Sequence, residues 1–277
     1  MIGLITVNYN NAKLTRNLIE SISDAGAAER FYIVIVDNAS DTDDWRELES
    51  ISRQYKDIHI VRNKENIGYF RALNVGINYL RKFSNQPKAI VICNNDIEFK
   101  PNFYYKLTEA LSGEAGRHAV IAPNIITPSG LHQNPHVVDG VGWARRLIWD
   151  IYYSNYLIAR IIYSIAMRTR PLTSRRDTQH HSKPGVIDQG YGACYILTSH
   201  FFEKFQDLWA PTFLMGEEYF LSQQLYSGNL STFYEPSISL IHLDHGSVGK
   251  MQSKKIWQIS KASHKIRRNF SLKSYGP

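Results

Sequence analysis

The first hundred residues alternate short apolar runs, rich in β-branched residues, with stretches in which apolar residues recur at helical spacing. This alternation is typical of a parallel sheet covered by helices, because strands that are buried on both faces read as continuous apolar runs. Four runs predict strands at 2–7, 32–36, 58–61 and 89–93. The chain is therefore expected to belong to the α/β class, with a mainly parallel central sheet.

Helices are predicted in the intervals between these strands. The first begins at Asn10 or Asn11, either of which suits an N-cap, and ends at Gly26. The second begins after residues 41–42, and the third covers about 69–82. Three helices are thus expected to cover the sheet formed by the first four strands.

The regular alternation weakens beyond residue 96, and prolines become the main signals. Pro101 is expected to open a helix, whereas Pro123, Pro128 and Pro135 are expected to mark loops. Later elements are predicted as a strand at 193–198, a helix at about 217–226, strands near 232 and at 238–241, and a basic C-terminal helix. One continuous α/β domain followed by a basic tail is the simplest organisation.

The composition indicates a chain that buries an ordinary core, since 43% of the 277 residues are hydrophobic. Cys93 and Cys194 each lie inside an apolar run, so we expect two core thiols and a reducing compartment. Met1 leads directly into an apolar strand without a secretory signal, which predicts a cytoplasmic location. Polar residues interrupt the longest apolar stretch, 147–167, and argue against a membrane-spanning helix.

The net charge of +7 comes from two segments. Residues 143–176 carry +6 and residues 250–273 carry +8, while the rest of the chain carries −7. A nucleic-acid-binding role would leave the acidic strand ends unexplained, so no nucleic-acid partner is expected. A single helix over 147–168 would gather its polar residues in one sector and suit the surface of an anionic membrane. Burial of that helix in the core or in a dimer interface is the alternative.

Polar residues follow every predicted strand of the first half. The strands end in the segments 8–10, 37–41, 62–66 and 94–96. In an open α/β sheet, ligands bind in the crevice beyond the carboxyl ends of the strands. These segments are therefore expected to line one ligand site.

The order and content of these segments resemble family 2 glycosyltransferases of the GT-A fold, especially bacterial rhamnosyltransferase-like members. The resemblance covers about residues 2–248 and rests on Val7-Asn8-Tyr9-Asn10, Val36-Asp37-Asn38-Ala39-Ser40, Asn63-x-x-Asn66-Ile67-Gly68, Asn94-Asn95-Asp96, Gly192-Ala193-Cys194-Tyr195, Gly216-Glu217-Glu218 and His242-x-x-His245-Gly246. It implies a GT-A nucleotide-sugar-binding sandwich over 1–248, with a nucleotide-binding half at 1–98 and an acceptor-binding half at 99–248. Residues 249–277 would form a basic helical tail.

The resemblance implies a donor site for a nucleoside diphosphate sugar, either dTDP-rhamnose or a UDP-sugar. Asp37 would accept from the ring N–H of the base, and Tyr9 would stack against it. The loop that ends at Gly68 would back the ribose and diphosphate, because glycine permits close approach or a positive φ. The implied donor-binding residues are Val7, Tyr9, Asp37, Asn66, Gly68, Arg71, Asn94 and Asn95.

Asn94-Asn95-Asp96 occupies the place of the family's Asp-x-Asp motif, which holds Mn²⁺ or Mg²⁺ against the donor diphosphate. Because Asn94 replaces the first acid, Asp96 supplies the only carboxylate of this segment. His242 or His245 matches the histidine that completes the metal site in some relatives, and an imidazole ligand favours Mn²⁺ over Mg²⁺.

Glu217-Glu218 matches the family's Glu-Asp motif, whose second acid takes the proton from the acceptor hydroxyl. An inverting transfer is a single displacement that needs one general base, and Glu218 is expected to be that base. The change from Asp to Glu leaves Glu217 as the alternative.

The implied function is inverting transfer to a glycan or a polyprenyl-linked glycan in bacterial surface polysaccharide synthesis, on the inner face of the cell membrane. A sugar-phosphate nucleotidyltransferase is a weaker interpretation, because it needs an early glycine-rich loop and residues 6–16 contain no glycine. A catalytically inactive carbohydrate-binding protein is the third possibility, since Asn94 replaces an acid.

Overall fold

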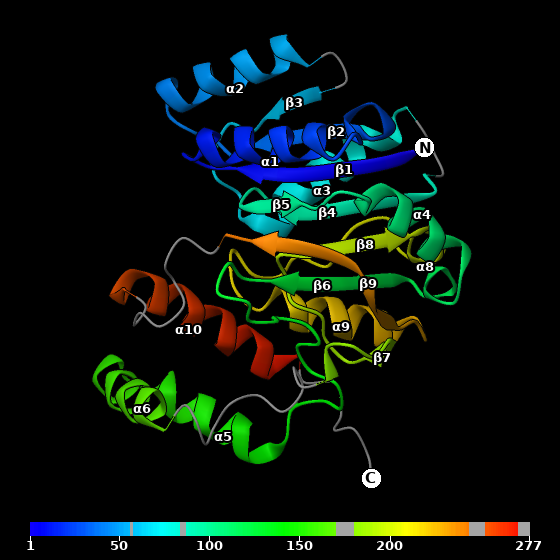
Figure 1. Ribbon diagram of the computed structural model, residues 1–277. Coiled ribbons are helices and arrows are strands. Elements are labelled where there is room, and N and C mark those ends of the chain that lie inside the picture. Colours follow the sequence, from blue (N-terminus) through cyan, green and yellow to red (C-terminus); the bar gives the residue numbers. More distant parts are fainter. Residues whose placement is uncertain (56–57, 84–86, 170–179, 244–252, 271–277) are drawn as a thin grey trace.

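The computed structural model describes residues 1–55, 58–83, 87–169, 180–243 and 253–270 (Figure 1). Within these residues one mixed sheet has the strand order β3-β2-β1-β4-β8-β6-β9-β5, and β7 pairs with β9. The strands are β1 (Ile2–Asn8), β2 (Tyr32–Asp37), β3 (Ile58–Arg62), β4 (Ala89–Asn94), β5 (Ile97–Phe99), β6 (Val120–Ile126), β7 (Gly185–Ile187), β8 (Cys194–Thr198) and β9 (Thr232–His242).

The first four strands are parallel, as the sequence predicts. Beyond β4 the sheet becomes mixed, because β8 runs antiparallel to both β4 and β6. The pairing of β4 with β8 joins the two predicted halves of the chain in one continuous sheet.

Helices cover both faces of the sheet, with α1 in front of it and α3 behind it in Figure 1. They are α1 (Ala12–Asp24), α2 (Thr42–Gln54), α3 (Tyr69–Arg81), α4 (Phe103–Ser112), α5 (Trp143–Tyr152), α6 (Tyr156–Arg168), α8 (Ser199–Lys204), α9 (Glu217–Ser227) and α10 (Lys254–Asn269). Alternate residues of one strand face opposite layers: Leu4 packs with α1 residues, whereas Ile5 packs with α3 residues. Burial on both faces is why β1 reads as a continuous apolar run.

Two predictions for the second half of the chain were wrong, one of a loop and one of two separate strands. Pro123 lies inside β6 at a register shift between Pro123 and Asn124, where a missing backbone donor is tolerated. The strands expected near 232 and at 238–241 are one strand, β9, whose pairing with β6 skips from Glu235 to Ser239 at the same irregularity.

The single helix considered over 147–168 does not form, since two helices, α5 and α6, occupy this region. The break falls at two good capping residues. Ser154 Oγ donates to the Ile151 carbonyl at 2.6 Å, and Asn155 Oδ1 accepts from the Leu157 amide at 2.8 Å. These bonds satisfy backbone groups at the end of one helix and the start of the next.

The basic C-terminal helix α10 packs against the rest of the structure. Trp257 is buried, and Ser263 Oγ donates to the Leu214 carbonyl at 2.6 Å. His264 lies 2.7 Å from Asp150 of α5. In the part of the chain that the structure describes, no helix has the length and apolarity needed to cross a bilayer.

Candidate active site

The carboxyl ends of the parallel strands meet at one edge of the sheet, because Val7 pairs with Asn94 and Asn8 pairs with Asp37. A cavity of about 250 Å³ opens at this edge. Its wall contains Val7, Tyr9, Asn11, Asn38, Asn66, Gly68, Tyr69, Asn94, Asn95, Asp96, Phe213 and Leu214. The structure therefore brings together six of the eight predicted donor-binding residues and the predicted metal ligand Asp96.

Buried polar contacts hold the strand ends beneath this cavity. The Asn8 amide donates to Asp44 Oδ2 at 2.6 Å and to Ser40 Oγ at 3.0 Å, and its carbonyl accepts from Thr15 Oγ1 at 2.8 Å. The Asn95 amide also donates to Thr15 Oγ1, at 3.0 Å. Among the described residues nothing donates to Asn95 Oδ1, so this oxygen is left as an acceptor beside the cavity.

Asp37, predicted to contact the donor base, does not line the cavity. Its side chain is fully buried, with Oδ2 3.2 Å from Arg62 Nε. Asn38 lines the cavity instead, and its Oδ1 accepts from Asn63 Nδ2 at 3.0 Å and from the Ile67 amide at 3.1 Å. Asp37 thus underlies the site, whereas Asn38 shapes the loop that leads to Gly68.

Arg71, also predicted to bind the donor, lies outside the cavity wall. Its Nε donates to the Ala210 carbonyl at 3.2 Å on an exposed surface. This bond ties α3 to the segment before residue 213.

Gly68 has two features that require glycine. Its φ is +91°, and a Cβ atom there would lie 2.1 Å from the Phe213 carbonyl oxygen. The next amide, that of Tyr69, donates to the same oxygen at 3.1 Å. Gly68 therefore allows the 213–214 segment to close one side of the cavity.

Asp96 and His242 meet because β5 pairs with β9, which places Ile97 opposite His242. His242 Nδ1 lies 2.8 Å from Gln133 Oε1, and His242 Nε2 lies 3.2 Å from Asp96 Oδ1. If Nδ1–H donates to Gln133, the lone pair of Nε2 faces a carboxylate oxygen that is buried without a hydrogen-bond partner. Two facing acceptors are satisfied by a cation between them or by a proton on the imidazole.

Asp96 and His242 therefore fit a divalent cation that takes further ligands from outside the protein. Among the residues that the structure describes, no group of three or more His, Cys, Asp or Glu side chains is arranged to hold a metal ion. His245, the alternative predicted ligand, lies outside the described residues.

Tyr69 is a cavity residue that the sequence did not reveal. Its hydroxyl is buried and has no hydrogen-bond partner in the described part of the chain. Burial raises the pKa of Tyr69 well above its usual value, and negative charge at Glu217 and Asp96 adds to the rise. Tyr69 lines the same cavity as the predicted metal ligand Asp96.

Glu217 and Glu218 open α9 after two residues in the left-handed region, Met215 at φ +74° and Gly216 at φ +90°. Glu217 is buried, and its Oε1 accepts from the Met215 amide at 2.9 Å. Burial, followed by the charge of Glu218, raises the pKa of Glu217 to about 7. A large share of Glu217 is therefore protonated at neutral pH.

Glu218 is less buried and faces the segment before β8. Its Oε1 accepts from the Gly192 amide at 3.3 Å. A Cβ atom at Gly192 would lie 2.8 Å from this oxygen, so a side chain at residue 192 would require the carboxylate to shift. The predicted Gly192 motif thus borders the predicted base.

The sequence matches the model of the family described as Glycosyl transferase family 2 over residues 4–173. The chain therefore belongs to glycosyltransferase family 2. No curated protein matches the sequence.

Solved structures share the fold at low sequence identity. A mannosyltransferase from Pyrobaculum calidifontis, in complex with GDP-Man and Mn²⁺, aligns with a TM-score of 0.59 at 13% identity over 100% of this chain and 65% of its own. The structure of S. aureus TarS 1–349 with UDP-GlcNAc gives 0.53 at 14% identity over 98% and 68%. GalNAc-T7 with UDP, GalNAc and Mn²⁺ gives 0.55 at 12% identity over 88% and 44%. The chain has the α/β fold of these GT-A glycosyltransferases and spans less than two thirds of two of them.

Proposed function

We propose that this chain is a metal-dependent, inverting glycosyltransferase that moves a sugar from a nucleoside diphosphate sugar to an acceptor hydroxyl. One observation carries the proposal. A single cavity at the strand ends gathers six predicted donor-binding residues beside the Asp96–His242 pair. The cavity wall is drawn from five separate segments of the chain, 7–11, 38, 66–69, 94–96 and 213–214, which supports the assignment of one ligand site.

The donor proposed is dTDP-rhamnose or a UDP-sugar. Tyr9 is half exposed at the cavity wall and offers an aromatic face to the base. Asn38 and Asn66 lie in the same wall, and Asn38 Nδ2 donates to Asn66 Oδ1 at 2.8 Å. In this proposal the amides recognise the nucleoside, and Asp37 holds Arg62 and the backbone beneath it.

Asp96 and His242 are the proposed metal ligands, and a nitrogen ligand favours Mn²⁺. When bound, the ion would offset the charge that develops on the departing diphosphate. Two solved relatives of the fold contain Mn²⁺ together with a nucleotide or nucleotide sugar, which supports this assignment.

Glu218 is the proposed general base. The acceptor oxygen forms a bond to the anomeric carbon, the bond from that carbon to the diphosphate oxygen breaks, and the hydroxyl proton passes to the Glu218 carboxylate. One displacement inverts the anomeric centre. Glu217 is a weaker candidate because it is buried and accepts from the Met215 amide.

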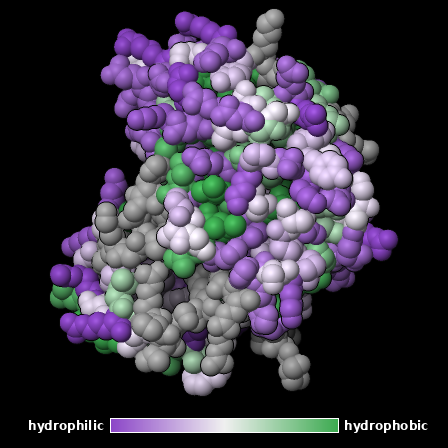
Figure 2. Space-filling view, in the orientation of Figure 1, coloured by the Kyte–Doolittle hydropathy of each residue, from purple (hydrophilic) through white to green (hydrophobic). Residues whose placement is uncertain are grey.

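The proposed acceptor is a glycan or a polyprenyl-linked glycan of bacterial surface polysaccharide synthesis, met on the cytoplasmic face of an anionic membrane. The pair formed by α5 and α6, here called the α5–α6 hairpin, supports membrane contact. Three α6 residues spaced one turn apart, Leu157, Ile161 and Ile165, expose 63%, 60% and 55% of their surface. Figure 2 shows hydrophobic and hydrophilic residues mixed on the surface where this hairpin lies.

The proposal is tested by incubating the chain with UDP-, dTDP- and GDP-sugars, Mn²⁺ or Mg²⁺, and glycan acceptors, and by following the product anomer by NMR. Metal-dependent transfer with an inverted centre is expected. Glu218→Gln should keep donor binding and lower turnover by about 10²-fold or more, as loss of a general base does. Normal turnover in Glu218→Gln together with an inactive Glu217→Gln would assign the base to Glu217, and a retained anomeric centre would exclude the single displacement.

A further inference from the structure

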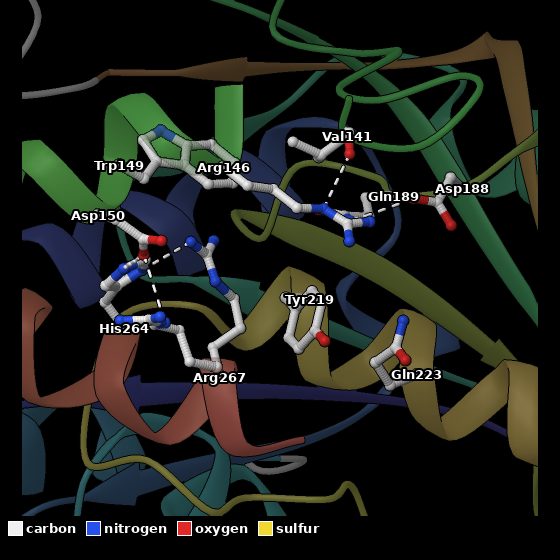
Figure 3. A pocket seen from close by; sticks show the side chains of 11 residues that line it. Val141, Arg146, Trp149, Asp150, Asp188, Gln189, Tyr219, Gln223, His264 and Arg267 are labelled. Atoms are coloured by element: carbon white, nitrogen blue, oxygen red, sulfur yellow. Dashed lines mark hydrogen bonds and ion pairs between the residues drawn. The ribbon is translucent and has the colours of Figure 1, made fainter. Parts of the chain in front are cut away.

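A second cavity, of about 180 Å³, lies between α5, α9 and α10. We call it the arginine cavity, since Arg146, Arg267 and Arg268 line it. Figure 3 shows Trp149 entering from α5, Tyr219 from α9 and Arg267 from α10. None of these side chains lines the cavity at the strand ends, which we call the donor cavity because it is the proposed donor site.

Arg267 is held in a fixed orientation. Its guanidinium carbon lies 4.2 Å from the ring centre of Trp149 and 5.6 Å from that of Tyr219. Its Nη2 lies 2.8 Å from His264 Nδ1, and His264 Nε2 lies 2.7 Å from Asp150 Oδ1. Because a guanidinium only donates, His264 Nδ1 accepts and Nε2–H donates to Asp150. Two rings and a chain of hydrogen bonds thus fix the guanidinium plane.

The positive charge at this cavity is incompletely neutralised. Among the described residues, Arg267 and Arg146 have no ion pair within 4.0 Å. Arg146 Nε donates to the Val141 carbonyl at 3.0 Å, which leaves its charge unpaired. Asp150 already accepts from His264 and lies 3.5 Å from Arg268. Asp188 is the other acid among the described residues of the wall, so that within the described part of the chain three arginines face two aspartates.

Two elements that line the arginine cavity also carry the proposed base and its hydrogen-bond partner. Tyr219 directly follows Glu218 in α9, and Gln189 lies in the same segment as Gly192, whose amide donates to Glu218. Helix α10 also reaches the donor side, because Ser263 Oγ donates to the carbonyl of Leu214, a residue of the donor cavity. The arginine cavity is therefore linked through α9, α10 and the segment before β8 to the proposed base and to the donor cavity.

We propose that the arginine cavity binds an anionic group, a carboxylate or a phosphate, carried by the sugar acceptor. The proposal rests on the proposed transferase function, because it assigns this place to the acceptor. A planar guanidinium donates two parallel hydrogen bonds to either anion, and stacking between rings fixes the plane in which it does so. A carboxylate would come from a uronic acid unit, and a phosphate from a phosphorylated or diphosphate-linked glycan.

Three sugars of matched size separate these sources: methyl glucuronide, methyl glucoside 6-phosphate and neutral methyl glucoside. Their dissociation constants are measured by ligand-observed NMR titration of the whole chain, with EDTA present so that no metal holds them in the donor cavity. The variants are Arg267→Gln, Arg267→Lys and Arg146→Gln. Arg53→Gln, on exposed α2, is the matched control.

We expect at least one anionic sugar to bind about tenfold more tightly than methyl glucoside. Arg267→Gln should remove this preference, Arg267→Lys should restore only part of it, Arg146→Gln should weaken it, and Arg53→Gln should leave it unchanged. A preference for the glucuronide identifies a uronate acceptor, and a preference for the phosphate identifies a phosphorylated one.

Equal binding of all three sugars, binding of none, or an undiminished preference in both Arg267→Gln and Arg146→Gln would overturn the proposal. Donor binding is measured separately, with nucleotide and Mn²⁺. If the wild-type chain binds no donor nucleotide, the proposed function is refuted. If it binds the nucleotide but shows no preference for an anionic sugar, only the proposed acceptor site is refuted.

Discussion

Gly192 determines how closely Glu218 can approach the segment before β8. A methyl group at residue 192 would lie 2.8 Å from Glu218 Oε1 and would displace the carboxylate. Moving a catalytic group by up to about 1 Å lowers the turnover rate. Gly192→Ala should therefore lower kcat by about tenfold or more. Donor affinity should stay unchanged, because residue 192 does not line the donor cavity.

Gly185→Ala is the matched control, since a Cβ atom there meets nothing within 4 Å. Steady-state kinetics on both variants check this prediction. Equal kcat in Gly192→Ala and Gly185→Ala would show that the contact with Gly192 does not position the base.

Glu217 should make the stability of the fold depend on pH. Its pKa is raised from 4.5 to about 7, so the folded chain holds this proton more tightly than the unfolded chain. The stabilising contribution is complete below pH 4.5 and is lost as the pH rises through 7. The free energy of unfolding should fall between pH 5 and pH 8 by on the order of 2 to 3 kcal/mol more in the wild type than in Glu217→Gln.

Urea unfolding at several pH values measures this difference. Glu20→Gln, which changes an exposed residue of α1, should follow the wild type. Parallel pH profiles for the wild type and Glu217→Gln would contradict the burial of a titrating carboxyl group at residue 217.

Single residues also show where sequence reasoning reached its limit. Strand ends identified segments that line the cavity, but not which side chain of a pair turns toward it. Asp37 and Asn38 are adjacent, and the strand's register buries Asp37 against Arg62 while Asn38 enters the wall. Tyr69 read as an ordinary helix residue, because only the tertiary fold places it in the same cavity wall as Asp96.

At the scale of elements, long periodic segments were predictable and irregular ones were not. The four parallel strands and the first three helices follow from apolar runs and capping residues. β6 was missed and β9 was predicted as two strands, because each contains a proline at a shared irregularity, and proline in a sequence ordinarily argues against a strand. The break between α5 and α6 depends on hydrogen bonds of Ser154 and Asn155 that periodicity does not reveal.

The α5–α6 hairpin carries the prediction of membrane contact. The double substitution Leu157→Ser with Ile161→Ser removes two exposed apolar side chains from one face of α6. Buried apolar area and basic residues together hold an interfacial helix at a membrane. The double variant should therefore lose most of the protein that co-sediments with anionic vesicles at low salt. Co-sedimentation with anionic and neutral vesicles measures this.

Tyr105→Ser, which removes an exposed aromatic side chain of α4, is the control and should bind like the wild type. Point substitutions are preferable to deletion of residues 250–277, because α10 contributes buried Trp257 and His264 to the packed structure. Equal recovery of the wild type with neutral and anionic vesicles would contradict the proposed membrane contact.

At the scale of the whole molecule, one mixed sheet links the parallel strands that carry the donor cavity to the antiparallel strands that carry the rest of the site. Residues in both parts of the sheet were identified from the sequence, because each group lies in a short local motif. It did not predict their distances, since the meeting of Asp96 with His242 depends on the pairing of β5 with β9. The sequence also did not predict that α10 lies beside α5 and α9 and forms the arginine cavity with them. The sequence of this segment shows only that it is basic.

We expect nucleotide-sugar binding to depend on a divalent cation held by Asp96 and His242. Calorimetric titration of UDP, dTDP and GDP into the wild type, Asp96→Asn and His242→Gln, with Mn²⁺ or with EDTA, measures this dependence. Mn²⁺ should tighten binding of at least one nucleotide by about tenfold or more in the wild type, and either substitution should remove most of this gain. Nucleotide binding that is equally tight with EDTA, or a Mn²⁺ effect that persists in both variants, would contradict this expectation.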